Sequence, residues 1–234
     1  MLWVIEISKI FEKKTENTNK TEKIYKNVRI ILRLHAKQDK IYCIQENNRG
    51  YIMEKIYETA YAKINLGLDV LGKRSDGYHE VRMVMQSVGL SDAVEIEEGE
   101  GLVVETDHSG LAGGPDNLAW KAAELLARCC GKIPNVHIRL NKKIFLAAGL
   151  AGGSSDAAAV MRGLSRLWQL DLTAPELEKL AAELGSDIPF CITGGTALAE
   201  GRGEILTELP EAPELLLVLA KPKLEVATGW VYGN

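Results

Sequence analysis

The stretch that decides the fold is Ala148-Gly149-Leu150-Ala151-Gly152-Gly153-Ser154-Ser155-Asp156-Ala157-Ala158-Ala159. Small residues crowd a loop, two hydroxyls follow, and an uninterrupted helical pattern begins directly after them. A glycine-rich loop brings backbone N–H groups close to an anion, because glycine has no Cβ to hold a ligand away. The N-terminus of the following helix adds positive partial charge at the same place. The stretch therefore predicts a phosphate-binding loop.

Two other kinds of nucleotide site are excluded by the same stretch. No lysine follows its last glycine, so it is not a Walker-type P-loop. It also does not combine a strand directly before it with an acidic residue at the spacing that a Rossmann dinucleotide site requires. Glycine- and alanine-rich turns also precede helices purely for tight packing, and this alternative stays open when the stretch is considered alone.

Composition and charge bound the class of protein. The 234 residues are 46% hydrophobic and 26% charged, with a net charge of −4. This is an ordinary globular balance, no apolar run reaches the length of a membrane span, and nothing suggests a nucleic-acid partner. The cysteines form no C-x-x-C pair and no metal-ligand spacing with the histidines, so we expect a reduced, cytoplasmic setting. They are Cys43, Cys129, Cys130 and Cys191.

The first 52 residues differ in composition from the rest. They hold 11 Lys and Arg against 6 Asp and Glu, whereas the remaining residues hold 17 against 26. Acidic residues interrupt the pattern of a secretory signal or a transit peptide. We predict that residues 1–52 are an extension outside the functional fold, that residues 53–212 form the catalytic domain, and that residues 213–234 begin a second domain.

Alternating hydrophobicity predicts a strand over Glu58–Leu71. One face carries the apolar residues from Ala62 to Val70 and is expected to be buried. Lys63 and Asn65 fall on the other face and could meet one ligand, although a solvated lysine on an exposed face is the simpler interpretation. The loop after this strand carries Tyr78 and His79, which could stack on a flat group or simply lie on the surface.

The rest of the chain predicts a mixture of strands and helices. The expected elements are a hairpin of Asp92–Glu98 with Leu102–Thr106, a helix Asp116–Cys130, a strand Val136–Ile144, the loop's helix Ser155–Leu170, a helix opened by a capping box at Thr173–Glu176 and ending near Gly185, a strand after Gly194-Gly195, a turn at 200–204 and a strand Leu215–Ala220.

Four motifs in order resemble a known family of enzymes. They are Ala60-Tyr61-Ala62-Lys63-Ile64-Asn65-Leu66, Asp76-Gly77-Tyr78-His79-Glu80, the loop Gly149–Ala158, and Gly185-Ser186-Asp187-Ile188-Pro189-Phe190. From Met53 onward the chain resembles the galactokinase, homoserine kinase, mevalonate kinase and phosphomevalonate kinase superfamily. The Lys63 strand and the loop with Tyr78 and His79 resemble the motifs of one branch of this superfamily, whose members phosphorylate 4-diphosphocytidyl-2-C-methyl-D-erythritol.

The resemblance implies an α+β, two-domain small-molecule kinase. ATP would phosphorylate the 2-hydroxyl of this substrate in the non-mevalonate isoprenoid pathway. Asp187 would orient that hydroxyl and accept its proton, and Lys63 would hold Asp187 ionised and balance phosphoryl charge. Asn65, Tyr78 and His79 would contact the cytidine-bearing substrate.

The resemblance also implies a nucleotide site with Mg²⁺ carried by the phosphates rather than by a protein side chain. The residues implied to bind ATP are Ala148, Gly149, Leu150, Gly152, Gly153, Ser154, Ser155, Asp116 and Asn117.

The chain departs from the family pattern in two places. Phe145 stands where the loop motif usually has a proline. The family's ferredoxin-like C-terminal domain would be mostly missing after Asn234, while the N-terminal mixed sheet and its helices would be largely complete. Two alternatives therefore remain: another small-molecule kinase of the superfamily, or a truncated fragment without activity.

Overall fold

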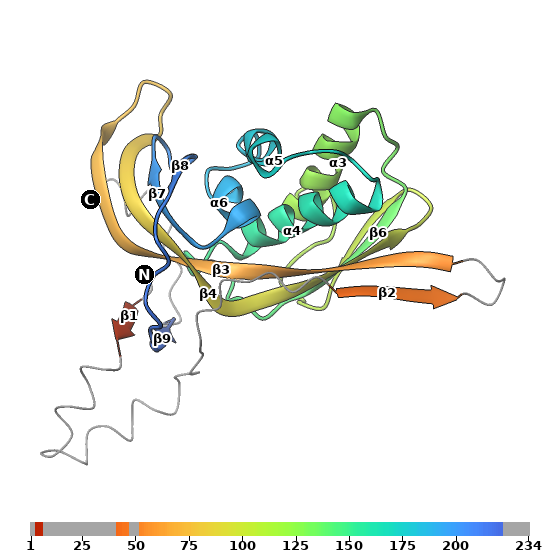
Figure 1. Cartoon of the computed structure of the whole chain (residues 1–234), viewed down its shortest axis with the longest axis horizontal. Helices are drawn as coiled ribbons and strands as arrows, with labels where there is room; N and C mark the ends of the chain where they lie inside the picture. The colour runs from red at the N-terminus through yellow and green to blue at the C-terminus, as the bar shows by residue number, and fades with distance from the viewer. Residues whose placement is uncertain (1–2, 7–40, 47–51, 222–234) are drawn as a thin grey trace, which may run out of the picture.

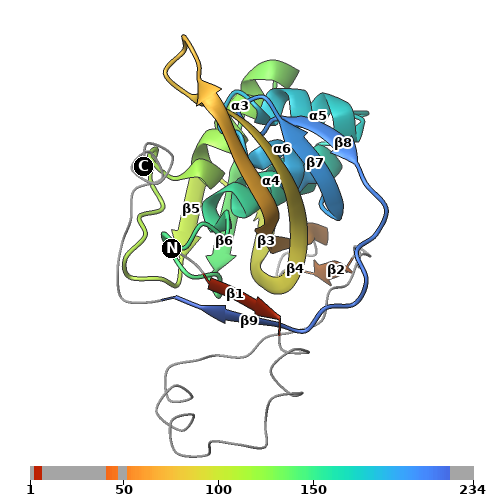
Figure 2. The same ribbon diagram turned by 90° about the vertical axis from the view of Figure 1, so that its left-hand side faces the viewer.

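The computed structural model describes residues 3–6, 41–46 and 52–221, and their side chains from residue 55 onward. In these residues a mixed sheet of seven strands carries four helices on one of its faces, and a separate two-stranded sheet lies below it (Figures 1 and 2). This is the α+β arrangement expected from the sequence. In the ranges described, no helix is both long enough and apolar enough to cross a membrane.

The large sheet has the strand order β2-β3-β4-β6-β5, and β7 and β8 extend it from the other end of β4. β3 and β4 form one long hairpin, and β2, β6 and β7 pair with it. The strands are β2 (Ile41–Glu46), β3 (Ile52–Lys73), β4 (His79–Glu98), β5 (Leu102–Thr106), β6 (Val136–Asn141), β7 (Thr196–Glu200) and β8 (Ile205–Glu208), and the small sheet pairs β1 (Trp3–Glu6) with β9 (Leu217–Ala220).

The expected hairpin of Asp92–Glu98 with Leu102–Thr106 is wrong. β6 lies between these segments, pairing antiparallel with β4 and parallel with β5. β6 buries every second residue, whereas β5 buries only Val104. The strand with the more apolar face takes the central place, where both its edges are paired, and β5 is left at the sheet edge.

The helices begin and end near their expected positions. Asn117 caps the first one, so it begins two residues later than predicted. The phosphate-loop helix begins at Gly152, three residues early, and the capping box of Thr173 with Glu176 is confirmed. The helices are α3 (Leu118–Cys130), α4 (Gly152–Leu167), α5 (Ala174–Ala181) and α6 (Ile188–Thr193).

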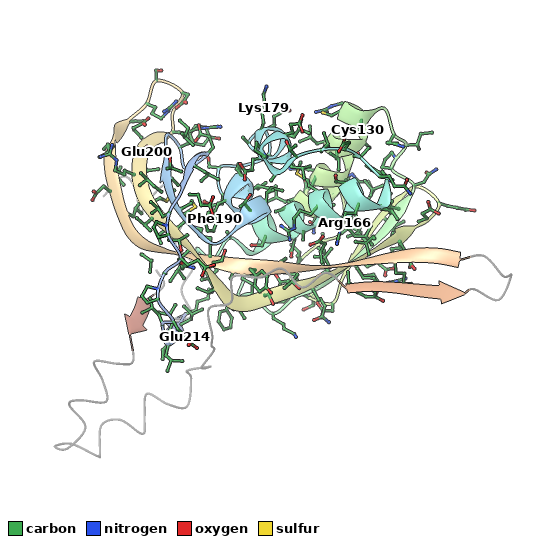
Figure 3. The ribbon with its side chains drawn as sticks, in the orientation of Figure 1. Cys130, Arg166, Lys179, Phe190, Glu200 and Glu214 are labelled. Carbon is green, nitrogen blue, oxygen red and sulfur yellow. The ribbon has the colours of Figure 1, made fainter. Side chains whose placement is uncertain are left out.

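α4 is the central helix of the core. It packs against α3, α6 and the β3–β4 hairpin, and most of its residues are buried. Its glycine at position 163 faces the sheet so closely that a Cβ there would lie 2.5 Å from Ile96 Cδ1. Figure 3 shows the neighbouring layers, with Phe190 of α6 inside the molecule and Lys179 on the outer side of α5.

The buried face predicted for the β3 strand is only half correct. Ala62 and Ile64 are buried, but Leu66, Leu68 and Val70 are exposed, Leu66 to 45%. The end of the β3–β4 hairpin reaches beyond the helices, so no described layer covers this face. Alternation therefore identified the strand correctly but not which part of it is covered.

Two short segments of the N-terminal region pair with the rest of the chain. β1 pairs with β9, and β2 pairs with the start of β3. The domain boundaries at residues 52 and 212 stay predictions. Residues 222–234, the end of the segment expected to begin a second domain, lie outside the described residues.

Candidate active site

The phosphate-binding loop has an unusual backbone. Ala147, Gly149 and Ala151 all have positive φ, at 50°, 73° and 57°. Only glycine adopts this region without strain, and an L-residue there is destabilised by about 1–2 kcal/mol. Such strain is retained where the surrounding structure fixes a backbone path for function. The loop thus holds its shape against local preference just before α4.

The start of α4 has no side-chain cap. Its N-cap is Ala151, which has no side chain able to accept from the first N–H groups. A Cβ on Gly152 would lie 3.0 Å from Ile144 Cγ2, and one on Gly153 would lie 3.4 Å from Leu118 Cδ1. The two glycines therefore serve tight packing against Ile144 and Leu118. The same lack of a Cβ would let a ligand come close to the backbone, so the packing and the phosphate-binding interpretations of the loop are compatible. Ala148 and Leu150 are buried, while Ser154 is half-buried on the first turn.

Lys63 and Asp187 form an ion pair beside this loop. The Lys63 Nζ lies 3.6 Å from Asp187 Oδ2 and donates to Asn65 Oδ1 at 3.1 Å. The Lys63 side chain is only 6% exposed, whereas that of Asp187 is 34% exposed and can be reached from solvent. The Lys63 backbone N–H donates to Leu150 O at 3.1 Å, which ties the pair directly to the loop.

An irregularity in the hairpin turns Lys63 toward Asp187. The register shifts between Tyr61 and Lys63. Before the shift, Ala60 packs in the core beneath α3 and α4; after it, Ala62 packs in a second cluster with Leu217 of β9. Bulges commonly redirect side chains in this way. Asp187 is the N-cap residue of α6 but makes no side-chain cap bond, so its carboxylate faces the lysine.

Ser155 connects α4 to the sheet. Its buried Oγ lies 2.6 Å from Tyr61 O and 2.9 Å from Ala151 O, two carbonyls that share its one proton, and 3.5 Å from Cys191 Sγ. Burial raises the pKa of the Cys191 thiol to about 12, so this thiol is neutral and unreactive at physiological pH. The hydroxyl thus fixes the helix start on β3, and its predicted contact with ATP stays a prediction.

Tyr78 and His79 lie apart from the Lys63–Asp187 pair, at the tip of the β3–β4 hairpin. The Tyr78 ring is 54% exposed, and the Arg202 guanidinium lies 5.0 Å from its centroid. Asp76 accepts the Tyr78 N–H at 3.1 Å and fixes the turn. Along the hairpin Lys63 pairs with Ser87 and Lys73 pairs with His79, so a ligand that contacts both Lys63 and the tip must span this stretch of β3.

Asp116 and Asn117 precede α3. Asn117 caps the helix, accepting from Ala119 N at 2.9 Å and donating to Ala112 O at 2.8 Å. Asp116 is exposed. The capping role accounts for the burial of Asn117 without a ligand. The adenosine contact expected of both residues stays a prediction.

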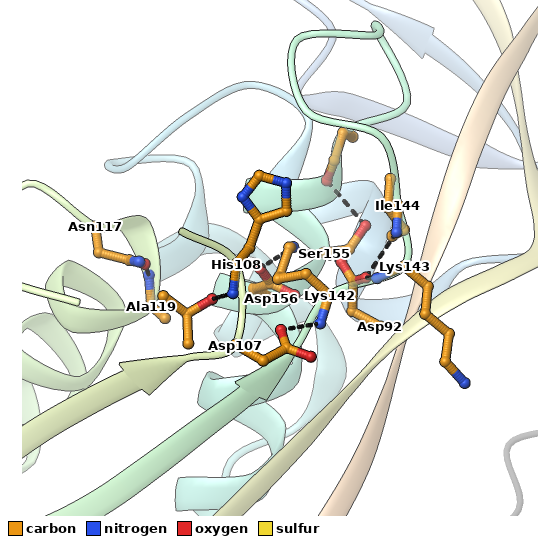
Figure 4. A network of polar contacts seen from close by, with 12 residues as sticks. Asp92, Asp107, His108, Asn117, Ala119, Lys142, Lys143, Ile144, Ser155 and Asp156 are labelled. Atoms are coloured by element: carbon orange, nitrogen blue, oxygen red, sulfur yellow. Dashed lines mark hydrogen bonds and ion pairs between the residues drawn. The ribbon is translucent and has the colours of Figure 1, made fainter. Parts of the chain in front are cut away.

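The sequence analysis missed a buried charge cluster behind the loop (Figure 4). Lys142 forms ion pairs with Asp92 of β4 and Asp156 of α4. All three side chains are at most 1% exposed. An aspartate inside an otherwise apolar helical pattern was the available signal, because a buried carboxylate requires a partner.

A cavity of about 710 Å³ lies elsewhere, beside the open edge of β3. Arg162 and Arg166 line it, and both pair with Glu58. Lys63 and Asp187 are not among its lining residues. The candidate site is therefore defined by the loop and the ion pair rather than by this cavity.

Residues 117–195 match the family of GHMP kinases, N-terminal domain. The chain contains a GHMP kinase N-terminal domain. The match spans the loop, α4 and Asp187, and it confirms the superfamily predicted from the motifs.

Two relatives similar to this chain are both named 4-diphosphocytidyl-2-C-methyl-D-erythritol kinase. The chain is 50% identical over 183 residues to the 4-diphosphocytidyl-2-C-methyl-D-erythritol kinase of Acetivibrio thermocellus, covering 78% of this chain and 65% of the relative. It is 53% identical over 175 residues to that of a Synechococcus species, covering 74% and 57%. The chain therefore spans less than two thirds of the length of these relatives.

Solved structures agree. A crystal structure of 4-(cytidine 5'-diphospho)-2C-methyl-D-erythritol kinase superposes with a TM-score of 0.61 at 35% identity, covering 76% of this chain and 63% of that one. The mevalonate kinase of Methanococcus jannaschii superposes with a TM-score of 0.51 at 14% identity, covering 66% and 56%. The second likeness concerns the fold alone.

Proposed function

We propose that the chain carries the catalytic part of an ATP-dependent kinase that phosphorylates the 2-hydroxyl of 4-diphosphocytidyl-2-C-methyl-D-erythritol. The observation that carries the proposal is the Lys63–Asp187 pair, held at 3.6 Å and tied through Leu150 to the phosphate-binding loop. The names of the relatives support the choice of substrate. Isoprenoid precursor synthesis in the cytoplasm is the corresponding setting.

Phosphoryl transfer requires alignment and charge neutralisation more than covalent chemistry. Asp187 is exposed enough to receive a substrate hydroxyl, orient it and accept its proton. Lys63, buried and bonded to Asn65, keeps a fixed positive charge beside the oxygen that develops charge. The N–H groups at the start of α4 bind the phosphates of ATP.

Mg²⁺ would enter with the ATP phosphates. Among the residues described there is no group of three or more His, Cys, Asp or Glu able to hold a metal ion. We assign the ion to the ATP phosphates, as the resemblance to the superfamily implies, and not to a protein side chain. When bound with ATP, the ion would neutralise part of the negative charge of the phosphates.

The decisive experiment measures ADP release by the purified chain with ATP, Mg²⁺ and the diphosphocytidyl-methylerythritol substrate. Asp187→Asn should lower turnover by about 10²–10⁴-fold, because a positioned proton acceptor is lost. The matched control is Asp171→Asn, since Asp171 is exposed at the other end of α4. Equal turnover in the wild-type chain and Asp187→Asn, or none in either, would contradict the proposal.

The substrate class is tested at the hairpin tip. Alanine at both Tyr78 and His79 should raise KM for the cytidine-bearing substrate while leaving KM for ATP unchanged, because the tip lies apart from the phosphate loop. An unchanged KM for this substrate would favour another small-molecule kinase of the superfamily.

A further inference from the structure

The buried charge cluster behind the phosphate loop contains more negative than positive charge (Figure 4). Lys142 follows β6 and leads into the loop, and its ammonium bonds to Asp92 Oδ2 and Asp156 Oδ2. Two carboxylates thus share one ammonium in a place that water does not reach. A net negative charge there lies directly behind the start of α4, where an anion is expected to bind.

The two carboxylates are not equally satisfied. Asp92 Oδ1 accepts the backbone N–H groups of Lys143 and Ile144, the latter at 2.8 Å. Asp156 Oδ1 is buried without any hydrogen-bond partner. Asp156 is therefore the carboxylate whose charge is less stabilised, and the one that gains more from protonation.

Burial raises the pKa of the Asp156 carboxyl to about 7; Lys142 opposes the increase and Asp92 adds to it. Within the described chain, no other charged side chain bonds to Asp156. On the loop after β5, Asp107 accepts the Lys142 backbone N–H at 2.9 Å, and His108 Nδ1 accepts from Gly110 N at 3.1 Å. Asp156 is thus divided between its two protonation states near neutral pH.

We propose that Asp156 is a positioning residue whose carboxyl takes up a proton from solvent when the phosphates of a nucleotide bind at the start of α4. The inference rests on the proposed function. Bound phosphate adds negative charge next to the cluster, so the second carboxylate becomes more costly to keep ionised. Protonation leaves Lys142 and Asp92 as a balanced pair that still holds the beginning of the loop.

The expected linkage has a definite sign. Above about pH 7 the free protein keeps Asp156 mostly ionised, so binding should take up about 0.5–1 proton per nucleotide between pH 7 and 8.5. Uptake should approach zero near pH 5.5, where Asp156 is already protonated. Nucleotide affinity should accordingly fall as pH rises above 7, by at most about tenfold per pH unit.

Isothermal titration calorimetry tests the proton uptake. ADP with Mg²⁺ is titrated into the full chain at pH 5.5, 7 and 8, in two buffers of different ionisation enthalpy, and the difference in binding heat gives the number of protons taken up. Asp156→Asn keeps the shape of the side chain but cannot titrate, so its proton uptake at pH 8 should vanish and its affinity there should exceed that of the wild type. Asp171→Asn should retain the wild-type uptake.

Each outcome decides the proposal. If the wild type binds ADP at pH 8 without proton uptake, the proposed role of Asp156 is wrong but the nucleotide site is not. This outcome holds even if Asp156→Asn fails to fold. Equal uptake in the wild type and Asp156→Asn would assign the proton to another group and would also overturn it. No binding heat at any pH would remove both the linkage and the nucleotide site on which the proposed function depends.

Discussion

The two ends of α4 are built on different physical principles. Its first turn follows a left-handed Ala151 and contains the buried Asp156, paired with Lys142. Its second half packs Gly163 against the sheet and contains Leu164, which is fully buried. The stability of the first end depends on the balance of buried charges and on a strained backbone. The stability of the second end depends on how well apolar groups fill the core. One helix thus supports the proposed phosphate site at one end because close packing fixes it at the other.

The largest effect is expected from Lys142→Met. It leaves two buried carboxylates without their cation, which should lower the free energy of unfolding by about 3–5 kcal/mol at pH 8. The loss should shrink as pH falls, because protonation of Asp156, whose pKa is raised by burial, then removes part of the uncompensated charge. Chemical denaturation at pH 8 and pH 5.5 measures both values.

A loss equal at both pH values would show that the lysine contributes by packing its methylene groups rather than by charge. The first end of α4 would then be stabilised by close packing, as the second end is.

Leu164→Ala probes the second end. It removes a fully buried side chain and should lower the free energy of unfolding by about 2–5 kcal/mol, with no dependence on pH. Leu66→Ala is the matched control, since Leu66 is 45% exposed, and it should lower that free energy by less than about 1 kcal/mol. A large effect of the control would show that the exposed face of β3 is covered in solution.

The smallest effect is expected from Ala151→Gly. Glycine adopts the positive φ of this position without strain, so the free energy of unfolding should rise by about 1 kcal/mol. Thermal unfolding measured beside the wild type would detect the change. A decrease instead would show that the Ala151 methyl packs favourably and that the loop is not strained there.

The sequence determined the local features of this protein. Glycines, alanines and two serines before an apolar helical pattern predicted the loop and α4, because backbone freedom and helix preference depend on neighbouring residues. The capping box at Thr173 fixed the start of α5 for the same reason. The ordered motifs also predicted the superfamily, which residues 117–195 confirm.

The tertiary structure decided everything that joins distant residues. It placed β6 between β4 and β5, left Leu66 exposed, turned Lys63 toward Asp187, and gathered Asp92, Lys142 and Asp156 into one cluster. The partners of the ion pairs are far apart in sequence: 14 positions separate Lys142 from Asp156, and 124 separate Lys63 from Asp187. Their meeting depends on strand order, on a shifted register and on burial, which arise only when the whole sheet and its helices pack together.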